Sequence, residues 1–362
     1  MAAGTPPPVG MSPRDRVLAA LTFRRPDVVP LEYHASPAGS YEHGSRLHAL
    51  WAGRPDDFGP PRRFPACRPR PGSVDAQGRY QEVLKDEWSV VRRHQVFGAA
   101  GFPVEQPLND WSRLPHFRFP AQPPASGPAF EVERARAAAH RRRYYLKSGW
   151  ISLFELMHSL RSFEDVLADI ALDRPEVHRL ADMLVEYHAA RIRYLLQRGV
   201  DAIQFGDDFG TQSGLILSPK MWRGFFRHRY EHLVRLAREG GAAVFFHSCG
   251  CVRALIEEFA ALGVDAIWPQ LSAYDTIWLA RLCRELKVPV ALHPDRGELM
   301  IRSRPEEVRA YVLRLAETFA VDRGGAWFYV EIDAGFPFEN VRALIDTIAS
   351  LRGAGESERG KP

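Results

Sequence analysis

The chain has 362 residues, of which 46% are hydrophobic and 25% charged, a composition typical of folded globular proteins and unlike that of disordered chains. Its 48 basic and 44 acidic residues leave a net charge of only +4, and the densest basic run, residues 140–143, lacks interleaved aromatic residues, so we expect no nucleic-acid partner. No run of 18 apolar residues predicts a membrane span, and four cysteines are too few for a disulfide framework. These features predict a cytoplasmic protein with no signal peptide.

The N-terminal third of the chain is predicted to be mostly irregular. Residues 1–10 are expected to form a disordered tail, and a first helix begins after Ser12, which can cap it. The sequence VVPLEYH, residues 28–34, predicts a first strand. Residues 35–140 are dense in proline and glycine, and within them only 80–93 has the alternation of a strand pair. We interpret this segment as a long irregular excursion with a β-hairpin, not as a separate domain.

From residue 144 onward, apolar strand-like runs alternate with helical periodicity. The predicted strands are 144–148, 202–206, 242–247, 266–269, 289–293 and 327–332, and the predicted helices are 174–198, 218–240, 252–262, 276–286, 305–319 and 340–351. Such alternation predicts a parallel sheet. With the first strand there are seven strands, and we expect an eighth within the excursion. The predicted fold is a (β/α)8 TIM barrel, a single domain over residues 11–355 that is followed by a tail, 356–362.

Polar side chains follow many of these strands. In a (β/α)8 barrel the active site lies at the carboxyl ends of the strands. Four such residues are candidates for binding a small-molecule substrate: Glu32, His34, Gln204 and Gln270. His293 stands alone at a strand end and is a candidate catalytic residue, although a lone histidine is more often structural. No glycine-rich phosphate loop follows a strand, which argues against a nucleotide-binding sheet.

The sharpest motif is FFHSCGC, residues 245–251. His247 and Cys249 are two residues apart at the end of an apolar strand, so both side chains can point to one side and converge on one ion. Imidazole and thiolate together suit Zn²⁺. Gly250 allows the backbone to turn sharply into the next helix. Alternatively, the cysteines are small core residues and the histidine is a hydrogen-bonded neighbour.

A metal site needs at least one further protein ligand. Cys251 is close, but three ligands within five residues would be geometrically tight. Glu331 and Asp333 follow another strand and are better placed as donors, unless they bond loop amides or pair with an arginine. We therefore predict His247, Cys249 and Glu331 as the ligands of one Zn²⁺, with Cys251 as the alternative third ligand.

A second acidic motif, QFGDDFGTQ, contains Asp207 and Asp208. Adjacent residues on a strand point to opposite sides, so only one of the two is expected to enter the pocket. A carboxylate beside a metal or another carboxylate has a perturbed pKa and can act as a catalytic acid or base. Alternatively, both residues cap a helix or bond loop amides.

Five segments, in this order and spacing, resemble the uroporphyrinogen decarboxylase superfamily, which includes haem-pathway decarboxylases and zinc-dependent, corrinoid-linked methyltransferases. The segments are 12–30, 85–91, 206–222, 245–256 and 337–345. The resemblance implies a (β/α)8 barrel with its pocket at the strand ends. True uroporphyrinogen decarboxylases carry an arginine-containing stretch near the first strand that clamps substrate carboxylates, whereas this chain has no arginine there until Arg46.

The methyltransferase branch of that superfamily uses a His-x-Cys pair and a later cysteine, and the last cysteine here is Cys283. The resemblance implies that Glu331 or Cys251 replaces the later thiolate, or that the metal is lost. The expected function is a zinc-dependent methyltransferase that moves a methyl group between a small substrate and a separate corrinoid protein, since no residues remain for a corrinoid domain. The alternative is a metal-independent decarboxylase that uses Asp207 or Asp208 on a smaller polar substrate.

Overall fold

A computed structural model describes residues 10–34, 36–54, 56–60 and 67–353. The tails predicted at 1–10 and 356–362 lie outside the described residues, apart from Gly10. The chain divides into two compact units, of which the first comprises residues 1–67, 138–146 and 265–362 and the second comprises residues 68–137 and 147–264. We describe each unit by itself, and the prediction of a single domain stays a prediction.

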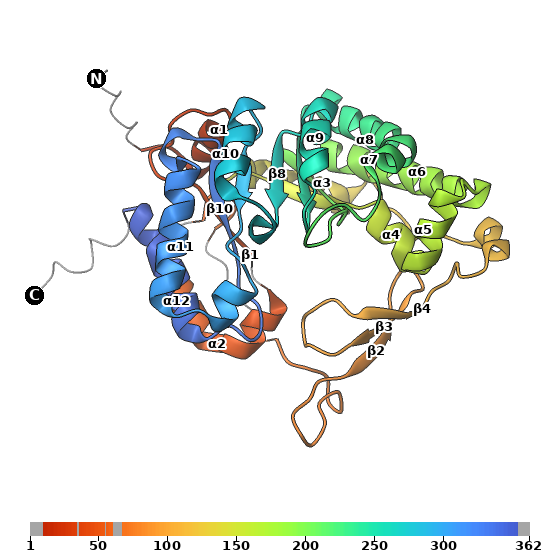
Figure 1. The fold of residues 1–362 in the computed structure, drawn as a ribbon, viewed down its shortest axis with the longest axis horizontal. Helices are drawn as coiled ribbons and strands as arrows, with labels where there is room; N and C mark the ends of the chain where they lie inside the picture. Colours follow the sequence, from red (N-terminus) through yellow and green to blue (C-terminus); the bar gives the residue numbers. More distant parts are fainter. Residues whose placement is uncertain (1–9, 35, 55, 61–66, 354–362) are drawn as a thin grey trace, which may run out of the picture. The chain divides into compact units, whose positions relative to one another are not determined.

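The first unit contains four parallel strands in the order β1–β10–β9–β8 (Figure 1). The strands are β1 (Leu31–His34), β8 (Ala266–Pro269), β9 (Val290–Leu292) and β10 (Ala326–Glu331). The longer helices are α1 (Pro13–Leu21), α2 (Pro37–Trp51), α10 (Thr276–Glu285), α11 (Pro305–Thr318) and α12 (Phe338–Leu351). Short turns complete the unit: η4 (Leu271–Ala273), η5 (Glu298–Arg302) and η6 (Val321–Arg323).

Helix starts in this unit follow from capping residues. Ser12 accepts a hydrogen bond from the Asp15 amide at 3.1 Å, as predicted for the start of α1. Asp275 accepts hydrogen bonds from two amides at the start of α10. Helices α11 and α12 lie side by side in Figure 1 and contact one another.

A buried ion pair holds the start of β1. Asp57 has no exposed surface and accepts hydrogen bonds from the Leu31 amide at 2.8 Å and from Arg352 Nη1 at 2.7 Å. Arg16 of α1 pairs with the other carboxylate oxygen of Asp57. Because a buried charge must be paired to be tolerated, this network ties Arg16 of α1 and Arg352, just after α12, to the first strand.

The second unit contains three parallel strands in the order β5–β6–β7, namely β5 (Lys147–Ile151), β6 (Ala202–Gly206) and β7 (Ala243–Ser248). Its helices include most of α3 (Pro128–Arg141), then α4 (Phe154–Leu160), α5 (Phe163–Ala171), α6 (Pro175–Arg198), α7 (Pro219–Trp222), α8 (His228–Glu239) and α9 (Ile256–Leu262). Three short helical turns add to these: η1 (Trp111–His116) before α3, η2 (Arg223–Arg227) between α7 and α8, and η3 (Arg253–Leu255) before α9.

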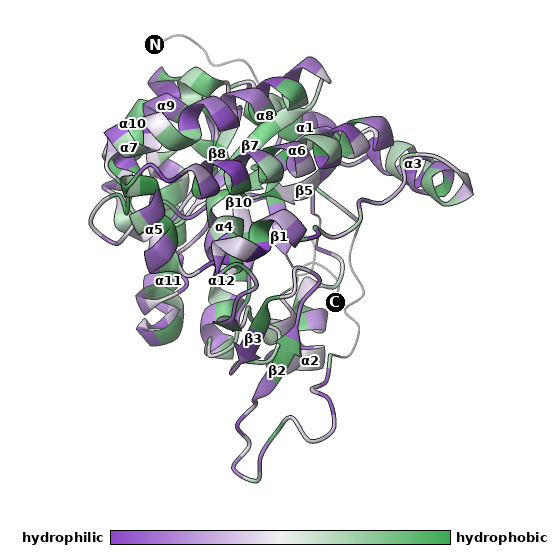
Figure 2. Ribbon diagram, turned by 90° about the vertical axis from the view of Figure 1, so that its right-hand side faces the viewer, coloured by the Kyte–Doolittle hydropathy of each residue, from purple (hydrophilic) through white to green (hydrophobic). Residues whose placement is uncertain are grey.

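Helices α6 and α8 contact each other, and they also contact β5 and β7, respectively. Figure 2 shows hydrophobic (green) and hydrophilic (purple) residues alternating along these helices. This pattern is expected of a helix that packs one face against strands and exposes the other to solvent. Strand β6 is buried at all five positions, and β7 at four of six. Strands that are buried on both faces are near-continuous apolar runs, which is why β6 has the bounds that the sequence predicted.

The described part of segment 35–140 contains more helix and strand than the sequence indicated. Strands β2 (Glu82–Lys85) and β3 (Val91–His94) form the expected antiparallel hairpin, and β4 (Phe102–Glu105) extends it to three strands. In the described part of this segment the strands pair only with one another, so the expectation of an eighth parallel strand is wrong there. Helices α2 and α3 were not predicted, although the alanine-rich sequence of α3 has high helix propensity.

Seven parallel strands and the helices between them confirm the predicted α/β fold of the (β/α)8 barrel class. Within each unit the strands run in the same direction, so their carboxyl ends share one edge of that unit's sheet. None of the helices in the described ranges is long and apolar enough to cross a membrane.

Candidate metal centre

The end of β7 presents a histidine and a cysteine toward one carboxylate. His247 is the fifth residue of β7, and Cys249 is the first residue after the strand. Asp208 lies just after β6, the strand next to β7. The backbone amide of the preceding residue, Asp207, donates a hydrogen bond to the backbone carbonyl of His247 at 3.1 Å. This bond continues the ladder between the two strands, so it aligns the loop after β6 with the loop after β7.

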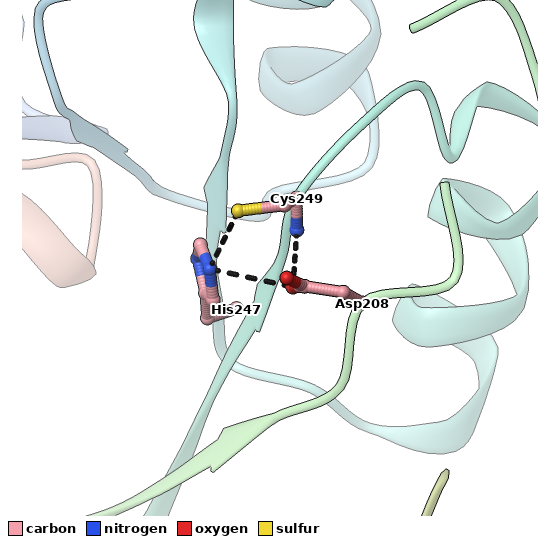
Figure 3. A group of neighbouring side chains, drawn as sticks. All are labelled: Asp208, His247 and Cys249. Carbon is pink, nitrogen blue, oxygen red and sulfur yellow. Dashed lines mark hydrogen bonds and ion pairs between the residues drawn. The ribbon is translucent and has the colours of Figure 1, made fainter. Parts of the chain in front are cut away.

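Figure 3 shows the three side chains pointing toward one another. Cys249 Sγ lies 3.3 Å from His247 Nε2, and His247 Nε2 lies 3.6 Å from Asp208 Oδ1. The Cys249 amide donates to the same Asp208 oxygen at 2.7 Å. The side chain of His247 is 12% exposed and that of Asp208 is 36% exposed, so the cluster opens to solvent on the side of Asp208.

These separations fit a tetrahedral zinc ion. One donor atom from each of Asp208, His247 and Cys249 lies within 4.8 Å of the others. With zinc–ligand bonds of about 2.0–2.3 Å, two donor atoms of a tetrahedral site lie roughly 3.3–3.6 Å apart. The two separations from His247 Nε2 fall in that range, so these three residues could hold zinc and leave one coordination position for another ligand.

Two glycines bring the two loops into contact. A Cβ atom on Gly250 would lie 2.2 Å from the carbonyl oxygen of Gly210, and a Cβ on Gly210 would lie 2.6 Å from the amide nitrogen of Cys251. Gly250 also has φ +71°, which side chains disfavour. The Cys251 amide donates to the carbonyl of Thr211 at 2.7 Å. The backbones therefore touch directly, which places Asp208 and Cys249 on adjoining loops.

Asp207 faces the interior instead of the cluster. Its wholly buried carboxylate accepts hydrogen bonds from the amides of Leu153 at 2.6 Å, Phe154 at 3.0 Å and Glu155 at 2.7 Å, at the start of α4. The hydroxyl of Tyr230 also donates to it. Burial raises the pKa of Asp207 to about 6, against the lowering effect of these donors. The expectation that only one of the two aspartates faces the site agrees with this arrangement.

Two residues of α4 that the sequence analysis missed interact with Asp208. Glu155 is hydrogen-bonded to the Asp208 side chain, and burial together with the charges of Asp207 and Asp208 raises the pKa of Glu155 to about 8. His158 lies within the electrostatic influence of Asp208, and burial lowers its pKa. Residues three apart share one face of a helix, so Glu-x-x-His after a strand end was the available signal.

The predicted ligand Glu331 lies in the first unit, at the end of β10, within a different polar cluster. Its carboxylate is 3.3 Å from Arg296 Nη1, which also lies 2.8 Å from an oxygen of Asp333, and it is 3.7 Å from His34 Nε2. Burial, and then the charge of Asp333, raises the pKa of Glu331 to about 7, while Arg296 acts in the opposite direction. Ligation by Glu331 or by Cys251 stays a prediction.

The remaining predicted residues have the following partners. Gln204, in the second unit, donates from its side-chain amide to the carbonyls of Phe205 at 2.8 Å and Phe245 at 3.4 Å. In the first unit, Glu32 accepts from Trp327 Nε1 at 3.2 Å, Gln270 donates to Ser272 at 3.3 Å, and His293 Nδ1 accepts from Trp268 Nε1 at 3.1 Å. Their roles in substrate binding and catalysis stay predictions.

Comparison with known proteins places the chain in a family of α/β barrel enzymes. The sequence model for uroporphyrinogen decarboxylase (URO-D) matches residues 132–351, more than half of the chain, and includes Asp208, His247 and Cys249. The chain belongs to the uroporphyrinogen decarboxylase family, which confirms the resemblance drawn from its motifs. No curated protein matches the sequence significantly.

Among solved structures, a methyltransferase from Methanosarcina mazei has the same fold, with 16% identity and a TM-score of 0.61 over 94% of this chain and 99% of that one. A B12-independent methionine synthase from Shewanella sp. W3-18-1 shares 13% identity over 80% of this chain and 77% of that one, with a TM-score of 0.41. A dihydropteroate synthase from Xanthomonas albilineans shares 14% identity over 55% and 66%, with a TM-score of 0.36.

Proposed function

We propose that this protein is a zinc-dependent methyltransferase that moves a methyl group between a small substrate and a separate corrinoid protein. The observation that carries the proposal is the convergence of Asp208, His247 and Cys249 on one point at the strand ends. Histidine nitrogen, cysteine sulfur and carboxylate oxygen are the three donor types that zinc takes in proteins. Three protein ligands with one open position are typical of catalytic zinc sites.

The proposal places Asp208 as the third ligand in preference to Glu331. Asp208 shares the second unit with His247 and Cys249, on the loop that Gly210 and Gly250 hold against the loop of Cys249. The carboxylate of Glu331 is instead paired with Arg296, which competes with any cation for its charge. A nitrogen, sulfur and oxygen set is harder than one with two thiolates, so it favours a substrate that presents oxygen.

The reaction on such a substrate is a transfer of CH₃⁺ from oxygen to a reduced corrinoid. The carbon–oxygen bond breaks and its electron pair stays on oxygen, which takes a proton from solvent water. The methyl carbon forms a bond to cobalt with the electron pair of the reduced corrinoid. When bound, zinc supplies Lewis acidity that stabilises the charge developing on oxygen. The residues of this chain hold the site in position. Asp207 fixes the start of α4, and the contact between Gly210 and Gly250 fixes the two loops that carry the ligands.

Metal analysis tests the proposal most directly. We expect about one zinc per chain by mass spectrometry when the protein is produced with zinc, at least a ten-fold loss of affinity in His247→Ala and Asp208→Ala, and wild-type content in Glu331→Gln, because only the first two remove a ligand. Cys249→Ser also removes a ligand and is expected to lower zinc affinity, and Cys251→Ser, which removes none, is its matched control. Zinc lost in Glu331→Gln but kept in Asp208→Ala would reassign the third ligand.

Absence of zinc from the wild-type chain even when the metal is supplied would refute the methyltransferase proposal. The metal-independent decarboxylase centred on Asp207 and Asp208 would then be the better hypothesis. A decarboxylase of this kind keeps full activity after chelation, whereas the methyltransferase loses its activity, so the two functions respond to chelation in opposite ways.

A further inference from the structure

One aromatic side chain beside the metal centre is unusually exposed for its position. Trp150 lies in β5, the strand next to β6, and 45% of its surface is exposed, whereas Ile151, the next residue, is fully buried. Tryptophan is highly buried on average in folded proteins. An exposed indole within a barrel strand therefore needs a physical reason.

The backbone of β5 directs this side chain. Ser148 pairs with Ile203 and Ile151 pairs with Phe205, so β5 carries one residue more than β6 across the same span. The extra residue forms a β-bulge at Gly149, which has φ +86° and whose Cβ, if present, would lie 2.6 Å from Leu195. Bulges of this kind re-aim side chains and are common next to active sites. The bulge thus changes the direction of the Trp150 side chain from the one that regular alternation of side chains along the strand would give it.

The neighbouring strand provides the space that the indole occupies. A Cβ on Gly206 would lie 2.2 Å from Cζ2 of Trp150, so the ring lies where any other residue would place its side chain. Gly206 pairs in register with His247, which puts the indole on the same face as the imidazole. The two ring centroids are 5.9 Å apart with an interplanar angle of 44°. Trp150 is therefore an exposed wall directly beside one of the three candidate ligands.

We propose that Trp150 is the specificity-determining wall of the site, on which the planar ring of an aromatic methyl ether stacks while its ether oxygen faces Asp208, His247 and Cys249. The inference rests on the proposed function and names its substrate class. Aromatic rings bind one another in stacked or tilted arrangements that saturated rings cannot match.

A matched pair of probes tests the role of the wall. Methoxybenzene and methoxycyclohexane carry the same oxygen and methyl group and differ in the planarity and aromaticity of the ring. We expect the zinc-loaded wild-type chain to bind methoxybenzene about five-fold or more tightly than methoxycyclohexane by calorimetry. Trp150→Ala removes the difference, Trp150→Phe keeps part of it, and zinc content stays unchanged in both.

Gly206→Ala is a second variant that acts through a different residue. Its added Cβ displaces the indole without deleting it, so it also lowers the preference for methoxybenzene. Leu172→Ala, which alters an exposed apolar side chain of the same unit, is the control and keeps the preference. Equal binding of the two probes to the wild-type chain overturns the inference. Loss of zinc in Trp150→Ala also overturns it, since the indole would then only position His247.

The outcome also separates this inference from the proposed function. If the wild-type chain holds no zinc but prefers methoxybenzene, and Trp150→Ala abolishes that preference, the methyltransferase proposal fails while the aromatic wall stands. If zinc is bound and neither probe is preferred, the metal centre stands and the wall fails.

Discussion

At the scale of single residues, Asp207 and Asp208 are neighbours in the chain with opposite environments. Asp207 is fully buried and accepts hydrogen bonds from backbone amides at the start of α4. Asp208 is partly exposed, and its carboxylate lies close to the side chains of His247 and Cys249. Both residues follow β6, and their partners differ: Asp207 accepts hydrogen bonds from amides at the start of α4, whereas Asp208 accepts one from the Cys249 amide. One aspartate therefore organises the fold, and the other is available for a ligand.

This division predicts different effects for the same conservative change. Asp207→Asn replaces a charged acceptor of several hydrogen bonds with an amide whose NH₂ group faces donors, so we expect the free energy of unfolding to fall by about 2–4 kcal/mol. Asp208→Asn changes a partly exposed carboxylate and costs less than about 1 kcal/mol. Denaturant unfolding of the metal-free proteins measures both. Equal losses would contradict the anchoring role of Asp207.

At the scale of elements, the site depends on two loops whose backbones touch. The loops after β6 and β7 approach at Gly210 and Gly250, where no side chain fits. The ligands are thus positioned by backbone contact and by parallel strand register, not by long flexible side chains. Sites that are supported by rigid elements hold their geometry with greater precision than sites on free loops.

Gly250→Ala tests this arrangement. The added methyl group would overlap the carbonyl of Gly210 and would also occupy an unfavourable φ, so we expect at least a ten-fold loss of zinc affinity and a stability loss of about 2–3 kcal/mol. Gly241→Ala is the matched control, since Gly241 has φ +83° but no atom within 4 Å of the added carbon. Gly241→Ala is expected to lower the free energy of unfolding only by the cost of a positive φ, about 1–2 kcal/mol, and to leave zinc binding unchanged. Similar zinc affinities in both variants would argue against the loop contact.

At the scale of the whole molecule, each of the two compact units carries a polar cluster. The second unit holds Asp208, His247 and Cys249, and the first unit holds Glu331 with Arg296 and Asp333. Each cluster lies at the carboxyl ends of parallel strands of its own unit, the place where active sites form in (β/α)8 barrels. Zinc binding should therefore affect the two units unequally.

Hydrogen exchange with and without zinc measures this inequality. We expect zinc to slow amide exchange in segments 206–211 and 247–252 by ten-fold or more, because binding stabilises the loops that supply ligands. Segment 328–334 of the first unit serves as the internal reference and stays unchanged. Slowing at 328–334 would show that Glu331 is a ligand after all, and removal of zinc by a chelator should reverse every effect.

Much of the fold was predictable from local pattern. The strands at 202–206 and 266–269 have the predicted bounds, because short apolar runs between turn residues are typical of buried parallel strands. The strand predicted at 144–148 instead spans Lys147–Ile151, since Tyr145 is buried in the first unit, where its amide donates to the backbone carbonyl of Asp57. Periodicity alone cannot tell which element buries an aromatic residue.

The sequence by itself determined the barrel class, the family and the His247–Cys249 pair, because all three depend on spacing along the chain. Only the tertiary structure decided that Asp208 joins this pair and that Trp150 forms a wall next to His247. These relations arise between neighbouring strands whose residues are some 40 to 100 positions apart in the chain. Strand register, a bulge and glycine contacts set them, and none of these has a local signature in the sequence.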